Sequence, residues 1–286
     1  MSFLYCVQKI IGKFINIICL VYGYLRYQSR KNQLPAVKND VLLIPAVEIA
    51  QRIKEKKAYL KRIEQVNPII NAVIKSRGEA IREAEPIDEK LESDWERVGH
   101  LPLLGVPFTV KDTVGVKGMP FCGGLVSRKN EIANKDSIVV SNLRQAGAIP
   151  IAITNVPEAL MSFGTSNCLF GRTNNPYDLA LIPGGSSGGE GALISSAGSI
   201  IGVGTDVGGS IRLPAYFCGI FGHKPSNGVI SCDGLFFLKA PELEPLFTAG
   251  PMCRYATDLK PMLKAMAKDQ ISRLPKIDSV VDLSKI

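Results

Sequence analysis

Residues 183–214 read PGGSSGGEGALISSAGSIIGVGTDVGGSIRLP, and this stretch predicts the centre of the fold. Two glycine-rich turns in it each present a serine, Ser186 in the first and Ser210 in the second. Between the turns, small apolar residues predict a helix over 191–199, followed by a buried strand over 199–203. A turn, a helix, a strand and a second turn in this order indicate an α/β architecture.

The rest of the chain also alternates helix and strand patterns. Residues 47–64 keep an approximate apolar stripe at helical spacing, and Asn67-Pro68 predicts the end of that helix, because the residue before proline avoids the α region. Residues 103–110 are apolar and predict a buried strand, and residues 137–153 predict a helix, a turn and a strand. Further helices are predicted over 79–91 and 256–267. The alternation predicts the α/β fold class.

Each glycine-rich turn is suited to stabilising negative charge. Glycine allows backbone conformations in which consecutive N–H groups point at one spot, and a helix that starts there adds its positive dipole end. Such a spot next to Ser210 is where a tetrahedral oxyanion would form. The alternatives are a flexible linker for the first turn and a plain β-turn with a capping serine for the second. The apolar run Ala192-Leu-Ile argues against a linker, because it follows the first turn at once.

A nucleophilic serine needs a base, and the chain offers a lysine and a histidine. Lys111 follows the apolar residues 106–110, where burial would lower its pKa and leave a neutral amine. Alone it would be read as a surface lysine, but together with two serine turns it reads as a base. Alternatively, Ser186, Asp206 and His223 follow the chain order of an α/β-hydrolase triad. That order lacks the strand required directly before the serine, so His223 is expected to be structural.

The segments together resemble the amidase signature family of serine hydrolases, from about residue 42 to about residue 268. The apolar, basic N-terminus and Phe221–Ser226 look most like the second type of fatty-acid amide hydrolase, a membrane-associated branch of that family. The motifs that carry the resemblance are Arg62–Pro68, Leu104–Pro107, Val110–Thr113, Thr154–Glu158, Gly171–Asp178, the two serine turns, Phe217–Pro225 and Gly250–Arg254.

The resemblance implies a mixed central sheet covered by helices and a Ser-Ser-Lys triad. In that triad Ser210 is the nucleophile, Ser186 is a bridging serine on a cis peptide bond, and Lys111 is the base. The oxyanion hole would be formed by the backbone N–H groups of Val207, Gly208, Gly209 and Ser210. The side chains expected to support the two turns are Asp206, Arg212 and Ser187.

Neither the resemblance nor the composition calls for a metal or another cofactor. The two histidines and seven scattered cysteines provide no zinc-ligand spacing. The net charge is +8, but no aromatic residues are interleaved with a basic patch, so nucleic-acid binding is not expected. The expected partners are a lipophilic amide substrate and a membrane. The sequence leaves the oligomeric state open, including a homo-oligomer.

The chain divides into an N-terminal segment, residues 1–35, and an amidase-signature domain, residues 36–286. The first is expected to be an uncleaved membrane anchor with a basic linker, because Phe14–Tyr24 is apolar and no small-residue cleavage site follows it. A hydrophobic helix packed on the domain is the alternative. The resemblance predicts an intracellular membrane location, at the endoplasmic reticulum or a lipid droplet.

Three functions remain open at this point. The first is hydrolysis of fatty-acid amides to a carboxylic acid and an amine. The second function is that of a non-catalytic, membrane-bound fragment. This hypothesis arises because the family's domain is usually far longer, so that the sheet is expected to be incomplete at its C-terminal end. A glutaminyl-tRNA amidotransferase-type subunit, which shares the signature, is the third.

Overall fold

The computed structural model describes residues 13–15, 17, 18, 22, 34–49, 57–83, 100–236, 241–274, 277 and 278. Within them, six strands form one mixed sheet in the order β1-β3-β2-β6-β8-β7. The strands of this sheet are β1 (Val73–Ser76), β2 (Pro107–Lys111), β3 (Ile149–Thr154), β6 (Ile201–Asp206), β7 (Phe221–Gly222) and β8 (Thr248–Cys253). A separate short pair is formed by β4 (Ser166–Asn167) and β5 (Gly171–Arg172).

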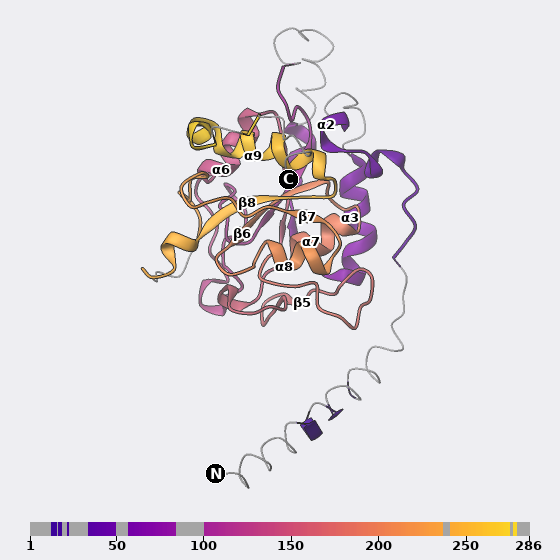
Figure 1. The fold of residues 1–286 in the computed structure, drawn as a ribbon. Helices are drawn as coiled ribbons and strands as arrows, with labels where there is room; N and C mark the ends of the chain where they lie inside the picture. Colours follow the sequence, from indigo (N-terminus) through magenta and orange to yellow (C-terminus); the bar gives the residue numbers. More distant parts are fainter. Residues whose placement is uncertain are drawn as a thin grey trace, which may run out of the picture.

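Helices cover both faces of the sheet (Figure 1). On one face, α6 (Ile138–Gln145) packs against α9 (Leu259–Ala267), and these helices contact β3 and β8. On the other face, α7 (Gly188–Ser195) contacts β2 and β6 and packs against α3 (Lys57–Ile70) and α8 (Arg212–Phe217). The shorter helical segments are α2 (Ala46–Ile49), η2 (Asp40–Leu43), η4 (Val126–Arg128), η5 (Glu158–Leu160), η6 (Glu244–Leu246), η7 (Ala256–Asp258) and η8 (Lys268–Arg273). Helices on both faces of a central mixed sheet confirm the predicted α/β class.

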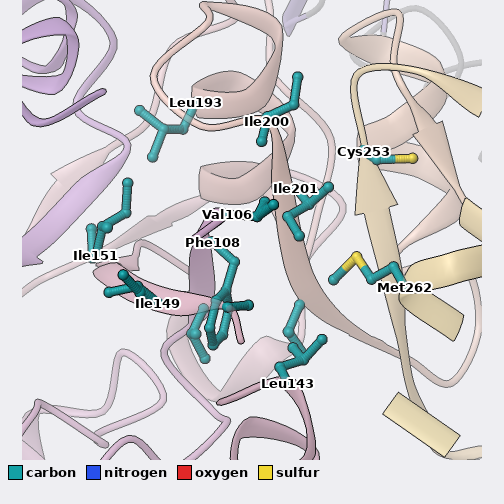
Figure 2. Close-up of a cluster of buried hydrophobic side chains, with 14 of the residues drawn as sticks. Val106, Phe108, Leu143, Ile149, Ile151, Leu193, Ile200, Ile201, Cys253 and Met262 are labelled. Atoms are coloured by element: carbon teal, nitrogen blue, oxygen red, sulfur yellow. The ribbon is translucent and has the colours of Figure 1, made fainter. Parts of the chain in front are cut away.

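Strand β2 lies in the interior of the sheet, parallel to β3 on one side and to β6 on the other. All five of its residues are buried, as its apolar sequence predicts. Side chains alternate along a strand, so Phe108 and Val110 share one face and Thr109 and Lys111 share the other. Figure 2 shows Phe108 in a cluster of buried apolar side chains that includes Leu143 of α6. The strand therefore fixes Lys111 on a rigid, water-excluded element.

The central part of the chain follows the sequence prediction closely. The predicted strand over 103–110 is β2, and the helix and strand predicted within 137–153 are α6 and β3. Ser137 begins α6 as its N-cap, because its hydroxyl accepts a hydrogen bond from the N–H of Val140 at 3.4 Å. Several bounds differ from the prediction: β2 begins at Pro107, α7 spans Gly188–Ser195 and so begins within the glycine-rich turn, and β6 spans Ile201–Asp206.

The prediction that Asn67-Pro68 ends a helix is wrong, because α3 continues to Ile70 with Pro68 inside its last turn. Proline removes the donor for the carbonyl of Glu64, but Glu64 is an exposed residue, so water can hydrogen-bond to that carbonyl instead. The helix ends instead at Ile70, and the next residue, Asn71, has a left-handed φ of 48°. Asn67 stabilises this end, because its Oδ1 accepts hydrogen bonds from two of the N–H groups that follow the helix.

Several predicted features lie outside the described residues. These are most of the predicted anchor and linker over 1–35, the middle of the predicted helix over 47–64, and most of the predicted helix over 79–91. In the described parts of the chain, no helix combines the length and the apolar character needed to cross a bilayer.

Candidate active site

The three predicted catalytic side chains come from three adjoining elements. Lys111 is the last residue of β2, Ser186 lies in the turn before α7, and Ser210 lies in the turn after β6. Because β2 and β6 are parallel neighbours, their carboxyl ends meet at one edge of the sheet. The site is built at this edge.

The Lys111 amine is buried and has three polar contacts. Its Nζ lies 2.7 Å from Ser186 Oγ, 2.9 Å from Thr205 Oγ1 and 3.2 Å from the carbonyl oxygen of Thr205. Thr205 was not predicted from the sequence. The contact arises because β2 and β6 are paired, and Val110 lies opposite Val203 in that pairing. The Lys111 amine is therefore held between Thr205 on β6 and Ser186 in the turn before α7.

Burial lowers the pKa of Lys111 to about 7, although the negative charges of Asp206 and Glu190 act in the opposite direction. A large fraction of the lysine is consequently uncharged at neutral pH. This is the protonation state that a base requires.

The peptide bond between Gly185 and Ser186 is cis, as the resemblance predicts. The backbone is tightly enclosed here, since a Cβ on Gly185 would lie 2.4 Å from the carbonyl oxygen of Ser162. Ser187 links the two serine turns. Its N–H donates to the carbonyl oxygen of Ser210 at 3.0 Å, and its hydroxyl donates to the carbonyl oxygen of Thr205 at 3.3 Å.

Asp206 organises the turn that carries Ser210. Its buried carboxylate accepts hydrogen bonds from the N–H of Gly209 at 2.7 Å and from the N–H of Ile211 at 3.0 Å. Arg212 donates to both carboxylate oxygens, at 3.1 and 3.0 Å. Burial alone would raise the pKa of Asp206, but these hydrogen bonds outweigh burial and lower it. The carboxylate is therefore ionised, and it acts as a support for the turn.

The four predicted oxyanion donors differ in their surroundings. The N–H of Gly209 already donates to Asp206. The N–H groups of Val207, Gly208 and Ser210 have no hydrogen-bond acceptor in the part of the chain that the structure describes. Three backbone donors of one turn thus have no partner among the described residues.

A cavity of about 450 Å³ opens at this site. Ser186, Thr205 and Ser210 are among its lining residues. The rest of its wall is mainly apolar, with Leu160, Met161, Phe163, Leu243 and Phe247 among the lining residues. Within the described residues, no group of His, Cys, Asp and Glu side chains is placed to hold a metal ion.

Comparisons with known proteins agree with the family resemblance noted in the sequence. A sequence model of the amidase family matches residues 56–284. The chain belongs to the amidase family. A fatty-acid amide hydrolase 2 from Homo sapiens is 46% identical over 280 residues, which cover 93% of this chain and 52% of the relative. Fatty-acid amide hydrolase 2-B from Danio rerio is 45% identical over 272 residues, covering 90% of this chain and 51% of the relative.

Solved structures of amidases have the same fold. A fatty acid amide hydrolase superposes with a TM-score of 0.75 at 32% identity, over 84% of this chain and 43% of that chain. A peptide amidase from Stenotrophomonas maltophilia gives a TM-score of 0.67 at 27% identity, over 88% of this chain and 51% of that chain. This amidase-family chain thus spans about half the length of the curated relatives it matches.

His223 does not take part in the amidase-family site as the structure places it. Its backbone N–H donates to the carbonyl oxygen of Pro251, and burial lowers the pKa of its imidazole. Among the described residues, no hydrogen bond joins its side chain to Ser186 or Asp206. The arrangement favours Lys111 over His223 as the base.

The hydroxyls of Ser186 and Ser210 line one cavity, although no hydrogen bond joins them within the described part of the chain.

Proposed function

We propose that this chain is a serine hydrolase of lipophilic amides that uses a Ser210–Ser186–Lys111 triad. The observation that carries the proposal is the hydrogen bond of 2.7 Å between buried Lys111 Nζ and Ser186 Oγ, at the wall of the cavity that also contains Ser210. Membership of the amidase family supports the same chemistry.

The contacts of Lys111 can be satisfied by a neutral amine. A neutral amine has two N–H donors and one lone pair, whereas an ammonium group has three donors and no lone pair. Thr205 supplies two acceptors, its hydroxyl and its carbonyl oxygen. The lone pair is then available for the hydroxyl proton of Ser186. Thr205 thus orients the base toward the bridging serine.

In the proposed reaction, Ser210 Oγ attacks the carbonyl carbon of the amide. Its proton passes to Ser186 Oγ as Ser186 gives its own proton to Lys111 Nζ. The N–H groups of Val207, Gly208 and Ser210 stabilise the oxyanion. The C–N bond then breaks as Lys111 returns the proton through Ser186 to the leaving amine. Water hydrolyses the resulting acyl ester by the same proton path, which releases the carboxylic acid.

The proposed substrate class follows from the wall of the cavity. Its few polar groups, which include Ser186 and Ser210, suit an amide group, and its apolar side chains suit a hydrocarbon chain. The relatives named as fatty-acid amide hydrolases support this choice. A lipophilic acyl chain would be held by side chains such as Leu160 and Phe247, with its carbonyl group next to Ser210.

A fluorophosphonate probe tests the proposal, because it forms a covalent bond with an activated serine. We expect the full chain to be labelled on Ser210, with a rate that rises with pH around a midpoint near 7 as Lys111 loses its proton. Mass spectrometry of the labelled peptide identifies the serine, and Ser210→Ala is the control that should remain unlabelled. A cooperatively folded chain that stays unlabelled at every pH would refute the triad and favour the non-catalytic alternative.

The membrane anchor is proposed on independent grounds. Phe14, Ile15, Ile17, Ile18 and Tyr22 are all more than half exposed in the structure. Burying such side chains in a bilayer is favourable by about 25 cal/mol per Å² of apolar surface, and neighbouring cations can contact anionic headgroups. We therefore propose that the protein associates with a membrane, and the resemblance favours an intracellular one.

Deleting residues 1–35 is expected to weaken the association of the protein with membranes. The intact chain should remain in the membrane fraction at high salt, because salt does not screen the apolar contribution. Sedimentation of both forms with and without salt measures the effect. Complete release of the intact chain by salt or alkaline carbonate would contradict an inserted anchor. Retention of the shortened form would indicate a second membrane-binding surface.

A further inference from the structure

Glu190 is a buried carboxyl group that the proposed reaction does not use. It lies in the first turn of α7, and its side chain is fully buried. Its Oε2 accepts a hydrogen bond from Thr109 Oγ1 at 2.6 Å, and its Oε1 accepts one from Thr154 Oγ1 at 2.9 Å. Two strands, β2 and β3, therefore each supply one hydroxyl group to this carboxyl.

These two threonines are the neighbours of Lys111 in the sheet. Thr109 is two residues before Lys111 on β2, so both side chains point to the same face. Thr154 lies directly opposite Lys111 in the pairing of β2 with β3. Neighbouring strands are about 4.8 Å apart. The hydrogen bonds from Thr109 and Thr154 thus hold Glu190 close to Lys111.

The third strand provides the space for this carboxyl. Gly202 of β6 lies opposite Thr109, and a Cβ at this position would be 1.9 Å from Glu190 Oε2. Any side chain at residue 202 would therefore displace the carboxyl. The carboxyl occupies a position that three adjacent strands define.

Few charged groups can act on Glu190. The buried titratable side chains on the elements packed against α7 and Glu190 are Lys111 on β2, Asp206 on β6, Cys253 on β8, and Tyr59 and Arg62 on α3. On α8, Arg212 is half exposed and is paired with Asp206. Lys111 is the cation whose charge acts on Glu190 and lowers its pKa. Within the described residues, Glu190 has no salt bridge.

Burial dominates these influences and raises the pKa of Glu190 to about 8. The surroundings accommodate the protonated acid, because its O–H can donate to a threonine oxygen while the Thr154 hydroxyl turns to the carbonyl oxygen of Val110, 3.5 Å away. Protonation of Glu190 also removes one of the two negative charges, its own and that of Asp206, that favour the ammonium form of Lys111. Both forms of the carboxyl are therefore compatible with the same contacts.

We propose that Glu190 is a positioning residue that titrates as a pair with Lys111: it is a neutral acid while Lys111 is the free base, and its ionisation makes that base stronger. The inference rests on the proposed function of Lys111. When Glu190 ionises, its proton goes to bulk water and both threonine hydroxyls donate to the carboxylate. The negative charge then stabilises the ammonium group that forms as Lys111 takes the proton of Ser186.

The pH dependence of Ser210 labelling by the fluorophosphonate tests this pairing. The full wild-type chain should show two increases in rate, one near pH 7 from Lys111 and a further one of about threefold near pH 8 from Glu190. Glu190→Gln keeps the shape of the neutral acid but cannot ionise, so the second increase should be lost. Glu64→Gln, the same change at an exposed position on α3, should retain both.

A second variant covers the case in which Glu190→Gln does not fold. Thr154→Val removes a hydrogen bond that lowers the pKa of Glu190, so the second increase should move to higher pH. A merely structural role would not predict that direction. A wild-type profile with one increase, a second increase that persists in Glu190→Gln, or an unmoved one in Thr154→Val would overturn the proposal.

Failure of the proposed function has a different signature. It would appear as a folded wild-type chain that is not labelled at any pH. In that case ¹³C NMR of the glutamate carboxyls decides on Glu190. A carboxyl that titrates near pH 8 and is missing from Glu190→Gln would support the neutral acid. Titration of every glutamate in the ordinary range, at about pH 4, would overturn it.

Discussion

Replacing Lys111 with alanine is expected to lower the rate of amide hydrolysis by about 10² to 10⁴-fold. The amine has two roles in the proposed reaction, because it removes a proton from Ser186 and later returns it to the leaving amine. Both roles depend on its contact with Ser186 at 2.7 Å. The measurement is the turnover of a long-chain fatty-acid amide and of the matched methyl ester. Ester cleavage should fall less at high pH, because an alkoxide leaves more readily than an amine anion.

Two further variants separate the chemistry of Lys111 from its packing. Lys111→Met keeps an apolar stem of similar length, so an equal loss of amide turnover would assign the effect to the amine and not to a void. His223→Ala should keep at least part of the activity, since no hydrogen bond in the described part of the chain joins His223 to the proposed nucleophile. Amide turnover in Lys111→Ala within about threefold of the wild type would rule out this mechanism.

The parts of the fold that follow from the sequence are those where local signals agree. The apolar residues before Lys111 predict a buried strand, and Ser137 predicts the start of a helix, because in each case the residue type and its spacing point the same way. Pro68 misled the prediction, because the preference against an α conformation before proline is weak enough for local contacts to override it. In α3 those contacts are the hydrogen bonds of the Asn67 side chain.

The parts of the site that the sequence missed depend on contacts between distant segments. An acid in the first turn of a helix, such as Glu190, usually interacts with the helix dipole in solvent, and no local signal shows that it is buried. Its burial follows from the packing of α7 on β2, β3 and β6. Thr205 likewise reaches Lys111 only because β2 and β6 are paired. The alternation of Thr109 and Lys111 on one strand was the available signal that both point to the same face.

Replacing Asp206 with asparagine is expected to reduce both stability and labelling of Ser210. The carboxylate accepts hydrogen bonds from the N–H groups of Gly209 and Ile211 and from the guanidinium of Arg212. An asparagine would direct an NH₂ group at some of these donors, leaving them unsatisfied in a buried site. Such a change costs about 2–4 kcal/mol of unfolding free energy. It would also disturb the turn that carries the nucleophile, so labelling should slow by about 10²-fold or more.

Denaturant unfolding of the full chain measures the loss of stability, and Arg212→Ala is the matched control. Arg212 is half exposed, so its removal should cost no more than about 1 kcal/mol while the backbone donors keep their acceptor. The effect of Asp206→Asn should also depend on pH. Because the folded protein lowers the pKa of Asp206, its stabilisation is fully present above the unfolded pKa of about 3.9 and is lost as the pH falls through the folded value.

The wild type and Asp206→Asn should therefore differ most in unfolding free energy at neutral pH, and the difference should shrink in acid. A difference that stays constant down to the lowest pH at which the wild type remains folded would show that the charge of Asp206 is not what stabilises the turn. Equal losses in Asp206→Asn and Arg212→Ala would instead assign the effect to the ion pair alone. The expected order, with the larger loss in Asp206→Asn, follows because Gly209 and Ile211 donate to different oxygens of this carboxylate, and an asparagine retains only one of the two.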